Sequence, residues 1–341
     1  MLNKIIAEES IQKAKKLIDK NDKIVIVTHV SPDGDAIGSS LALYHFLTEL
    51  GKQVNVIVPN EFPRFLNWMV DAGEIILGDR SPEIAQETIE AAELIFCLDF
   101  NDLKRISQLE SIVREAHGKK VMIDHHPSPE NFCDLTISHP EISSTSELIF
   151  RFICRMGMFE YVDKPCAECI YAGMMTDTGA FTYNSNSPAI YYIIGELLEK
   201  GINKDDIHSK VYDSCSKYRV RLQGFILHEK MQLFEEYKTS LITLSLEEHK
   251  KFNPQKGDTE GFVNIPLSIE NIVFSAFIRE EKDMVRLSFR SRGNFPANQF
   301  AGEIFNGGGH LNASGGEFYG NLEDAIALFK AALPRYKHLL I

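Results

Sequence analysis

The sequence has no apolar run of the ~18 residues that would indicate a membrane-spanning helix. Residues 1–20 form an amphipathic pattern of acids and lysines, without the apolar core and small-residue cleavage site of a signal peptide. With 44% hydrophobic and 25% charged residues, the composition is that of an ordinary soluble globular protein. We therefore expect a cytoplasmic protein with no membrane partner.

An excess of positive charge is also absent, since the formal net charge is −12. Tight binding to long nucleic acid relies on many contacts from lysine and arginine to phosphate, and this chain has no long basic run. Long duplex nucleic acid is therefore excluded as a partner. A small anionic ligand remains compatible, because metal ions and a few local arginines can supply a positive field.

Cysteine is scarce, and the six residues are scattered. Cys166 and Cys169 form a CxxC pair, but no second CxxC or nearby histidine pair completes a zinc site. The pair falls in a predicted helix over 165–175, where residues three apart share a face. We interpret both as buried structural cysteines.

The first half of the chain alternates between strand and helix patterns, which predicts an α/β fold with a doubly wound, mainly parallel sheet. At 341 residues the chain has room for two domains. Strands are expected at 23–29, 53–58, 94–99 and 119–124, and helices at 36–50, near 62–70, and at 143–156, 165–178 and 188–200.

The second half has a different pattern, typical of a smaller α+β domain. One long helix is expected from about 218 to 237, followed by an alternating strand at 239–246. A hairpin of 272–279 and 284–290, a glycine-rich stretch and a closing helix at about 321–335 come next. We predict a metal-binding domain at 1–190, a helical connector at 191–238 and a second domain at 239–341.

A histidine and two aspartates follow the first predicted strand. His29, Asp33 and Asp35 come directly after an apolar, β-branched run. The carboxyl ends of strands in open α/β sheets are where ligands bind. Holding two carboxylates this close together is costly unless a cation lies between them. The segment therefore predicts a cation site.

Further ligand candidates share this context. Asp99 ends one apolar strand, the triplet Asp124-His125-His126 ends another, and Asp177 lies at the end of a predicted helix. A single Asp after a strand is usually a turn former or a helix cap, and a single pair of histidines is usually structural. Three strand ends that all carry Asp or His are much harder to explain in that way.

Six side chains are more than one catalytic metal usually takes from a protein. Shared between two metals, with one bridging carboxylate, they fit a two-metal site. Oxygen and nitrogen ligands without thiolate favour Mn²⁺, with Mg²⁺, Co²⁺ or Fe²⁺ as alternatives, over structural zinc. The six candidates are His29, Asp33, Asp35, Asp99, His125 and Asp177.

These motifs resemble those of the DHH phosphoesterases, whose namesake triplet stands here as Asp124-His125-His126. The opening segment, Asp99 and Asp177 match further motifs of that family. The stretch from Asn306 to Gly316 looks like the GGGH motif of the associated DHHA1 domain. The resemblance covers nearly the whole chain in the right order, and it is strongest to the compact two-domain oligoribonuclease/pAp phosphatases called nanoRNases.

The resemblance implies a role for each ligand candidate. His29 and Asp33 would hold one metal, and Asp35, His125 and Asp177 would hold the other, with Asp99 bridging both. His126 would face the substrate phosphate as an electrostatic stabiliser or proton donor. Asp124 would orient a histidine or the loop. Hydrolysis would use a water activated by the two metals.

The glycine-rich stretch and the end of the hairpin are candidates for substrate binding. Gly308 and Gly309 would allow close backbone approach to an anion, beside His310. Arg290 could bind a phosphate through two parallel hydrogen bonds, and Ser288 and Ser291 lie near it in the sequence. Taken separately, the glycines could form a flexible turn and the arginine could be a solvated charge. By resemblance, the active site would lie in the cleft between the two domains.

The predicted reaction is hydrolysis of very short oligoribonucleotides, such as pApA, to mononucleotides and of pAp to AMP. Partners would be short oligoribonucleotides and nucleotide phosphates, and a homodimer stays open. The alternatives within the superfamily are an exopolyphosphatase or pyrophosphatase and a cyclic-dinucleotide phosphodiesterase. A non-catalytic nucleotide sensor is disfavoured because all six candidate ligands are present.

Overall fold

The computed structural model describes residues 4–214, 216–253 and 257–340. The chain divides into two compact units, Met1–Ser214 and Cys215–Ile341. This division falls inside the range 191–238 that was predicted as a connector. No helix in the described ranges is long and apolar enough to cross a membrane.

The first unit is built on a six-stranded sheet in the order β3-β2-β1-β4-β5-β6, and every strand pair is parallel. The predicted doubly wound sheet is therefore confirmed. Its elements are α1 (Glu8–Lys20), β1 (Lys23–Val27), α2 (Gly34–Glu49), β2 (Gln53–Val58), β3 (Ile76–Leu77), α3 (Pro82–Glu90), β4 (Leu94–Leu98), α4 (Glu110–Glu115), β5 (Lys119–Asp124), β6 (Leu135–Ser138), α5 (Thr145–Arg155), α6 (Lys164–Asp177), α7 (Pro188–Glu199) and α8 (Lys204–Tyr212).

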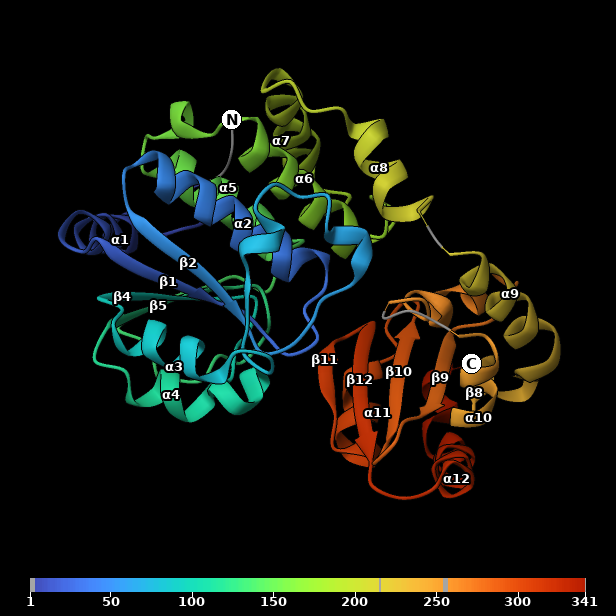
Figure 1. Cartoon of the computed structure of the whole chain (residues 1–341). Coiled ribbons are helices and arrows are strands. Elements are labelled where there is room, and N and C mark those ends of the chain that lie inside the picture. Colours follow the sequence, from blue (N-terminus) through green and yellow to red (C-terminus); the bar gives the residue numbers. More distant parts are fainter. Residues whose placement is uncertain (1–3, 215, 254–256, 341) are drawn as a thin grey trace. The chain divides into compact units, whose positions relative to one another are not determined.

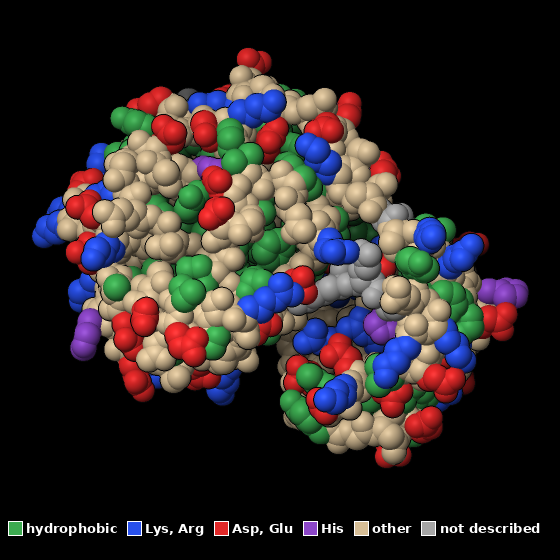
Figure 2. Space-filling model, in the orientation of Figure 1, with side chains coloured by type: hydrophobic (Ala, Val, Ile, Leu, Met, Phe, Trp, Pro, Cys, Tyr) green, Lys and Arg blue, Asp and Glu red, His purple; other side chains and the backbone are tan. Residues whose placement is uncertain are grey.

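Both faces of this sheet are covered by helices. Ile24, Phe96 and Ile123 pack on the face that carries α1, α2, α5 and α6, whereas Val25 and Cys97 pack on the face that carries α3 and α4 (Figure 1). Burial on both faces explains why these strands are nearly continuous apolar runs. On the face of this unit that Figure 2 displays, acidic and basic side chains are interspersed.

The second unit holds a mixed sheet in the order β11-β12-β10-β9-β8-β7, in which only β8 and β9 are parallel among the strands described. The α+β prediction is confirmed. Its elements are α9 (Lys217–Phe225), β7 (Met231–Phe234), β8 (Thr239–Leu244), α10 (Leu246–Lys251), β9 (Phe274–Glu280), β10 (Val285–Ser291), α11 (Ala297–Phe305), β11 (Gly308–His310), β12 (Ala313–Phe318) and α12 (Leu322–Leu340).

The sequence prediction was wrong in two helical regions. The expected long helix over 218–237 ends early, because a π-helical turn at Ile226–Lys230 leads directly into β7. Residues near 62–70 form only a short 3₁₀ segment, Arg64–Leu66, rather than a regular helix. In both regions tertiary packing decided against the local helical pattern.

The two cysteines of the CxxC pair are buried in α6, as expected for structural residues. Burial is the main reason why the pKa of each thiol lies above its ordinary value, so neither is predisposed to react as a thiolate. Cys166 Sγ donates to the carbonyl oxygen of Ala42 at 3.2 Å, which ties α6 to α2. The interpretation as core residues is confirmed.

Candidate metal centre

The predicted ligands of the first unit converge at the carboxyl edge of the parallel sheet. His29 follows β1, Asp99 follows β4, and Asp124 is the last residue of β5. These three strands are neighbours in the order β1-β4-β5. The strands are added in opposite directions from β1, because β2 and β3 lie on one side of it and β4 to β6 on the other. Doubly wound sheets open a ligand-binding crevice at such a position.

One group of possible ligand atoms comes from His29, Asp33 and Asp99, and these atoms all lie within 4.8 Å of one another. His29 Nε2 lies 3.9 Å from Asp33 Oδ1 and 3.4 Å from Asp99 Oδ2. Asp33 also caps α2, because its Oδ1 accepts hydrogen bonds from the N–H groups of Asp35 and Ala36 at 3.0 Å each. The cap holds this carboxylate beside the histidine.

A second group comes from Asp35, His125 and Asp177. His125 Nε2 lies 3.9 Å from Asp35 Oδ2 and 3.6 Å from Asp177 Oδ2. The same nitrogen lies 3.6 Å from Asp99 Oδ1. Asp99 therefore directs one carboxylate oxygen toward each group. Its backbone φ of 61° lies in the left-handed region, which Asp tolerates better than most residues do.

Both histidines present the same ring nitrogen to the carboxylates. Nδ1 lies 2.9 Å from the Val30 carbonyl oxygen in His29 and 3.2 Å from the Ile142 carbonyl oxygen in His125. A carbonyl oxygen can only accept, so Nδ1 carries the proton in each hydrogen bond. In the neutral rings Nε2 is then the atom with the lone pair, as metal ligation requires.

The electrostatics of the two groups favour a bound cation. Burial raises the pKa of Asp35 well above its ordinary value, and the charges of Asp99 and Asp177 raise it further. Burial by itself would lower the pKa of His125, but Asp177, Asp99 and Asp35 raise it to about 9. Carboxylates crowded in this way are relieved either by protons or by a divalent ion. The donor set is therefore of the kind that binds divalent metals.

Two glycines allow the helices that carry Asp35 and Asp177 to approach closely. A Cβ atom at Gly38 in α2 would lie 2.7 Å from the carbonyl oxygen of Cys169 in α6, and a Cβ atom at Gly173 would lie 1.9 Å from Ser146 Oγ. Only glycine fits at such distances. Because α2 and α6 cross here, the first turn of one helix and the last turn of the other meet at the candidate metal site.

The N-terminus of α5 contributes residues that the sequence analysis missed. The N–H groups of Thr145 and Ser146 donate to Asp35 at 2.6 and 2.8 Å, and Thr145 Oγ1 donates to Asp99 Oδ1 at 2.9 Å. Ser144 caps the helix by accepting from the Glu147 N–H at 3.0 Å. The Ser-x-x-Glu spacing in the sequence indicates the start of a helix, but it does not indicate that the helix start would contact Asp35 and Asp99.

Asp124 and His126 form a third group together with Asp99. His126 Nδ1 and Asp124 Oδ1 are 2.7 Å apart, and the same nitrogen lies 3.8 Å from Asp99 Oδ1. Burial and the charge of Asp99 raise the pKa of Asp124 to about 7. This short contact fixes the orientation of the His126 ring.

The predicted substrate residues of the second unit occupy two adjacent rows of the sheet. Arg290 and His310 both pair with Ala313, so their side chains share one face of the sheet. Ser288 and Gly308 both pair with Gly315 in the next row of that same face. Strand pairing thus brings these four residues together.

Ser291 and Gly309 belong to the opposite, core-facing set. Ser291 is buried, and its hydroxyl donates to the Phe295 carbonyl oxygen at 2.8 Å. Gly309 pairs with Ser314. Its backbone φ is 137°, and a Cβ atom at this position would lie only 2.5 Å from the Ala313 carbonyl oxygen, so the position requires glycine. The structure therefore does not bring these two side-chain positions to the face that carries Arg290.

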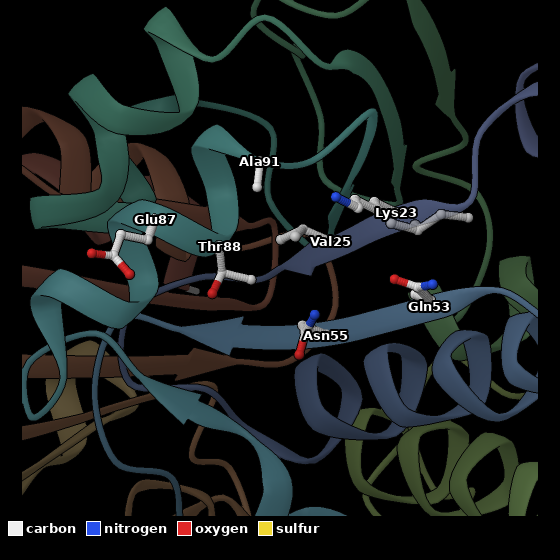
Figure 3. Close-up of a pocket in the computed structure, with 8 residues that line it drawn as sticks. Lys23, Val25, Gln53, Asn55, Glu87, Thr88 and Ala91 are labelled. Carbon is white, nitrogen blue, oxygen red and sulfur yellow. The ribbon is translucent and has the colours of Figure 1, made fainter.

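A hollow of about 280 Å³ lies elsewhere in the first unit, at the amino ends of β1 and β2. Figure 3 shows Lys23, Gln53, Asn55 and Glu87 around it. Ligands of doubly wound sheets bind at the other edge, where the strands end. None of the predicted site residues lines this hollow.

Comparison with known families supports the resemblance noted in the sequence. Residues 23–174 match the model of the DHH family, N-terminal domain, and residues 238–334 match that of the DHHA1 domain. The first range covers the candidate metal centre except for Asp177, and the second covers the strands that carry Arg290 and His310.

Three curated relatives resemble most of the chain. Proteins named bifunctional oligoribonuclease and PAP phosphatase NrnA, from Thermus thermophilus and Bacillus subtilis, are 30% and 29% identical. Their alignments span 87% and 89% of this chain and 84% and 92% of the relatives. A cyclic-di-AMP phosphodiesterase PdeA from Listeria monocytogenes is 25% identical over 88% of this chain and 45% of its own length.

Solved structures share the same architecture. An exopolyphosphatase-related protein from Bacteroides fragilis has a TM-score of 0.95 at 59% identity, with 99% of each chain covered. RecJ from Thermus thermophilus, solved with Mn²⁺, has a TM-score of 0.52 at 14% identity, covering 97% of this chain and 54% of RecJ. The second likeness shows the fold alone.

The predicted enzyme class, a hydrolase of phosphoester bonds, is confirmed at the level of the family, whose curated members are named as oligoribonuclease and phosphatase. With both domain models matched in order and a relative aligned over most of its length, this chain belongs to the DHH family of phosphoesterases, and its residues 238–334 form a DHHA1 domain.

Proposed function

We propose that this chain is a metal-dependent phosphoesterase that hydrolyses very short oligoribonucleotides, such as pApA, to mononucleotides and pAp to AMP. The substrate assignment is supported by the names of the Thermus and Bacillus relatives. The observation that carries the two-metal assignment is the position of Asp99, whose oxygens lie 3.4 Å from His29 Nε2 and 3.6 Å from His125 Nε2.

The residues fit a pair of divalent ions. His29 and Asp33 would hold one, Asp35, His125 and Asp177 the other, and Asp99 both. Their oxygen and nitrogen atoms favour Mn²⁺, with Mg²⁺ or Co²⁺ as alternatives, and the distant fold relative RecJ was solved with Mn²⁺. When bound, two such ions lower the pKa of a shared water and neutralise charge on the phosphoryl oxygens.

His126 and Asp124 would act together beside this centre. Because Asp124 holds the ring through Nδ1 at 2.7 Å, the imidazole cannot turn away from the site. His126 would face the substrate phosphate as an electrostatic stabiliser or as the proton donor to the leaving oxygen. An imidazole is suited to either role near neutral pH.

The second unit would recognise the part of the substrate away from the scissile bond. Arg290, Ser288, Gly308 and His310 share one sheet face, so a phosphate could contact them together. Gly309 and Ser291 would support this face from behind, through close strand packing and the hydrogen bond to Phe295.

Arg290→Ala is expected to weaken AMP binding about tenfold or more, the size of a lost charge-assisted hydrogen bond, and to leave the Mn²⁺ content unchanged. Arg292→Ala, a change of the neighbouring arginine two positions along the chain, is the matched control. Loss of the metal from the Arg290 variant would contradict this division of labour.

Two other activities have support from the comparisons. The Listeria relative is named as a cyclic-di-AMP phosphodiesterase, and the Bacteroides structure as exopolyphosphatase-related. The DHHA1 match over 238–334, together with the names of the Thermus and Bacillus relatives, favours a nucleotide substrate over pyrophosphate. A cytoplasmic location and a homodimer stay predictions.

One assay separates these candidates. Purified protein with Mn²⁺ is tested against pAp, pApA, cyclic di-AMP, 5-mer and 24-mer RNA, polyphosphate and pyrophosphate. We expect release of AMP from pAp and pApA and little cleavage of the 24-mer. Asp99→Ala is the control for contaminating activity. If the wild type turns over no substrate faster than this variant does, the proposed function is wrong.

A further inference from the structure

Arg105 lies in the segment that leaves the carboxyl end of β4, beside the candidate metal centre. It belongs to the 3₁₀ segment Leu103–Leu109, which follows Asp99 along the chain. Leu103 and Ile106 of this segment are fully buried. The Arg105 carbonyl oxygen accepts a hydrogen bond from the Val30 N–H at 2.7 Å, which ties the residue to the segment next to His29.

The charge of Arg105 reaches both flanks of the site. The pKa of His29, which follows β1, and that of Asp124, which ends β5, are both raised on balance, and the positive charge of Arg105 makes a smaller contribution that opposes each rise. The sheet order is β1-β4-β5, so the segment that follows β4 starts between the strands that lead to His29 and Asp124. Arg105 is half-buried.

Within the described ranges, the guanidinium of Arg105 takes part in no hydrogen bond or ion pair with protein. Two other arginines of this unit differ, and Arg64 is exposed rather than half-buried. Arg114 contacts Glu110 and Glu130, and Arg80 contacts Glu61. A half-buried arginine without a protein acceptor, next to a centre proposed to bind a substrate phosphate, is available to bind an anionic ligand.

The charge balance of the centre explains why such a residue is needed. Asp33, Asp35, Asp99 and Asp177 together match the charge of two divalent ions. The loaded site therefore has no net positive charge to attract a phosphate group. A fixed guanidinium at its edge supplies that charge, and its fork geometry fits two non-bridging phosphoryl oxygens.

We propose that Arg105 binds the non-bridging oxygens of the scissile phosphoryl group and favours phosphates that carry two negative charges. This inference rests on the proposed phosphoesterase function. It adds a residue of the first unit to the substrate contacts, separate from Arg290. The scissile phosphate of pAp is a dianionic monoester and that of pApA a monoanionic diester, so Arg105 contributes more to pAp hydrolysis than to pApA hydrolysis.

The test compares Arg105→Met, Arg105→Lys and the control Lys104→Met, a neighbouring exposed cation. The contact with Val30 uses the backbone of Arg105, so the substitutions leave it in place. Melting temperature and Mn²⁺ content are measured first, and both are expected to match the wild type. Binding of inorganic phosphate to the Mn²⁺-loaded protein is then measured by calorimetry, independently of turnover.

We expect Arg105→Met to weaken phosphate binding and to lower kcat/KM for pAp by about 10- to 100-fold, the effect of one charge-assisted contact. The loss with pApA is expected to be smaller, and Arg105→Lys to recover part of both. Unchanged phosphate binding, or a loss of metal or fold in both Arg105 variants, would overturn the inference. A wild type that binds phosphate through Arg105 but hydrolyses neither nucleotide would refute the proposed function alone.

Discussion

Thr145 Oγ1 donates a hydrogen bond of 2.9 Å to Asp99 Oδ1, which links the first turn of α5 to the carboxylate between the two ligand groups. The Thr145 N–H donates at the same time to Asp35. A residue with no predicted role therefore restrains two of the proposed ligands. Loss of groups that orient ligands in this way commonly lowers metal affinity by about 10- to 100-fold.

Thr145→Val is expected to weaken Mn²⁺ binding about tenfold, because Asp99 loses its hydroxyl partner while the backbone contact to Asp35 remains. Thr145→Ser retains the hydroxyl and should restore affinity. Calorimetric titration of the metal-free protein measures both. Equal affinities for the valine and serine variants would show that the hydroxyl has no part in holding the site.

Metal binding is expected to release protons from the protein below pH 9. In the metal-free site neighbouring carboxylates raise the pKa of His125 to about 9, so the ring is protonated at pH 7. A ligand imidazole must be neutral, and its proton leaves when the metal binds. Apparent affinity should therefore rise with pH and level off near pH 9. Calorimetry in two buffers of different ionisation enthalpy counts the protons, and a count of zero at pH 7 would be inconsistent with this site.

His126→Ala separates a role at the substrate from a role as a ligand. We expect kcat to fall by about 10²- to 10⁴-fold, as for a lost general acid, with the Mn²⁺ affinity nearly unchanged. Asp124→Asn should shift the pH profile of kcat, because the amide alters the partner of His126 Nδ1. If His126→Ala loses a metal ion instead, the group of Asp99, Asp124 and His126 is itself a metal site.

Gly38→Ala is expected to destabilise the first unit by about 1–3 kcal/mol, because the new methyl group would meet backbone atoms of α6 at 2.7 and 2.9 Å. Metal affinity should fall as well, since α2 and α6 carry Asp35 and Asp177. Gly195→Ala in α7 is the matched control. Nothing lies within 4 Å of its new methyl group, and alanine favours a helix by up to about 1 kcal/mol. Urea unfolding of both variants measures the difference, and equal stabilities would argue against close helix contact.

The order of elements in the first unit could be predicted because its signals are local. β2 and β5 begin and end where the apolar runs at 53–58 and 119–124 do. The failure over 218–237 has the opposite cause. Residues from Met231 onward pair with β8, and such a contact with a distant strand overrides a helical pattern.

Sequence alone determined which residues are candidate ligands and roughly where each lies. Asp and His at strand ends can be read from the chain, since an apolar run must stop where polar groups begin. Tertiary structure decided how they meet. Asp99 faces both His29 and His125 because β4 lies between β1 and β5, and Thr145 reaches Asp99 because α5 packs beside α6. The contact between Arg105 and Val30 was likewise set by tertiary structure, because contacts between distant segments leave no local pattern in the sequence. The separation of Ser291 from Arg290, in contrast, follows from the alternation of side chains along β10.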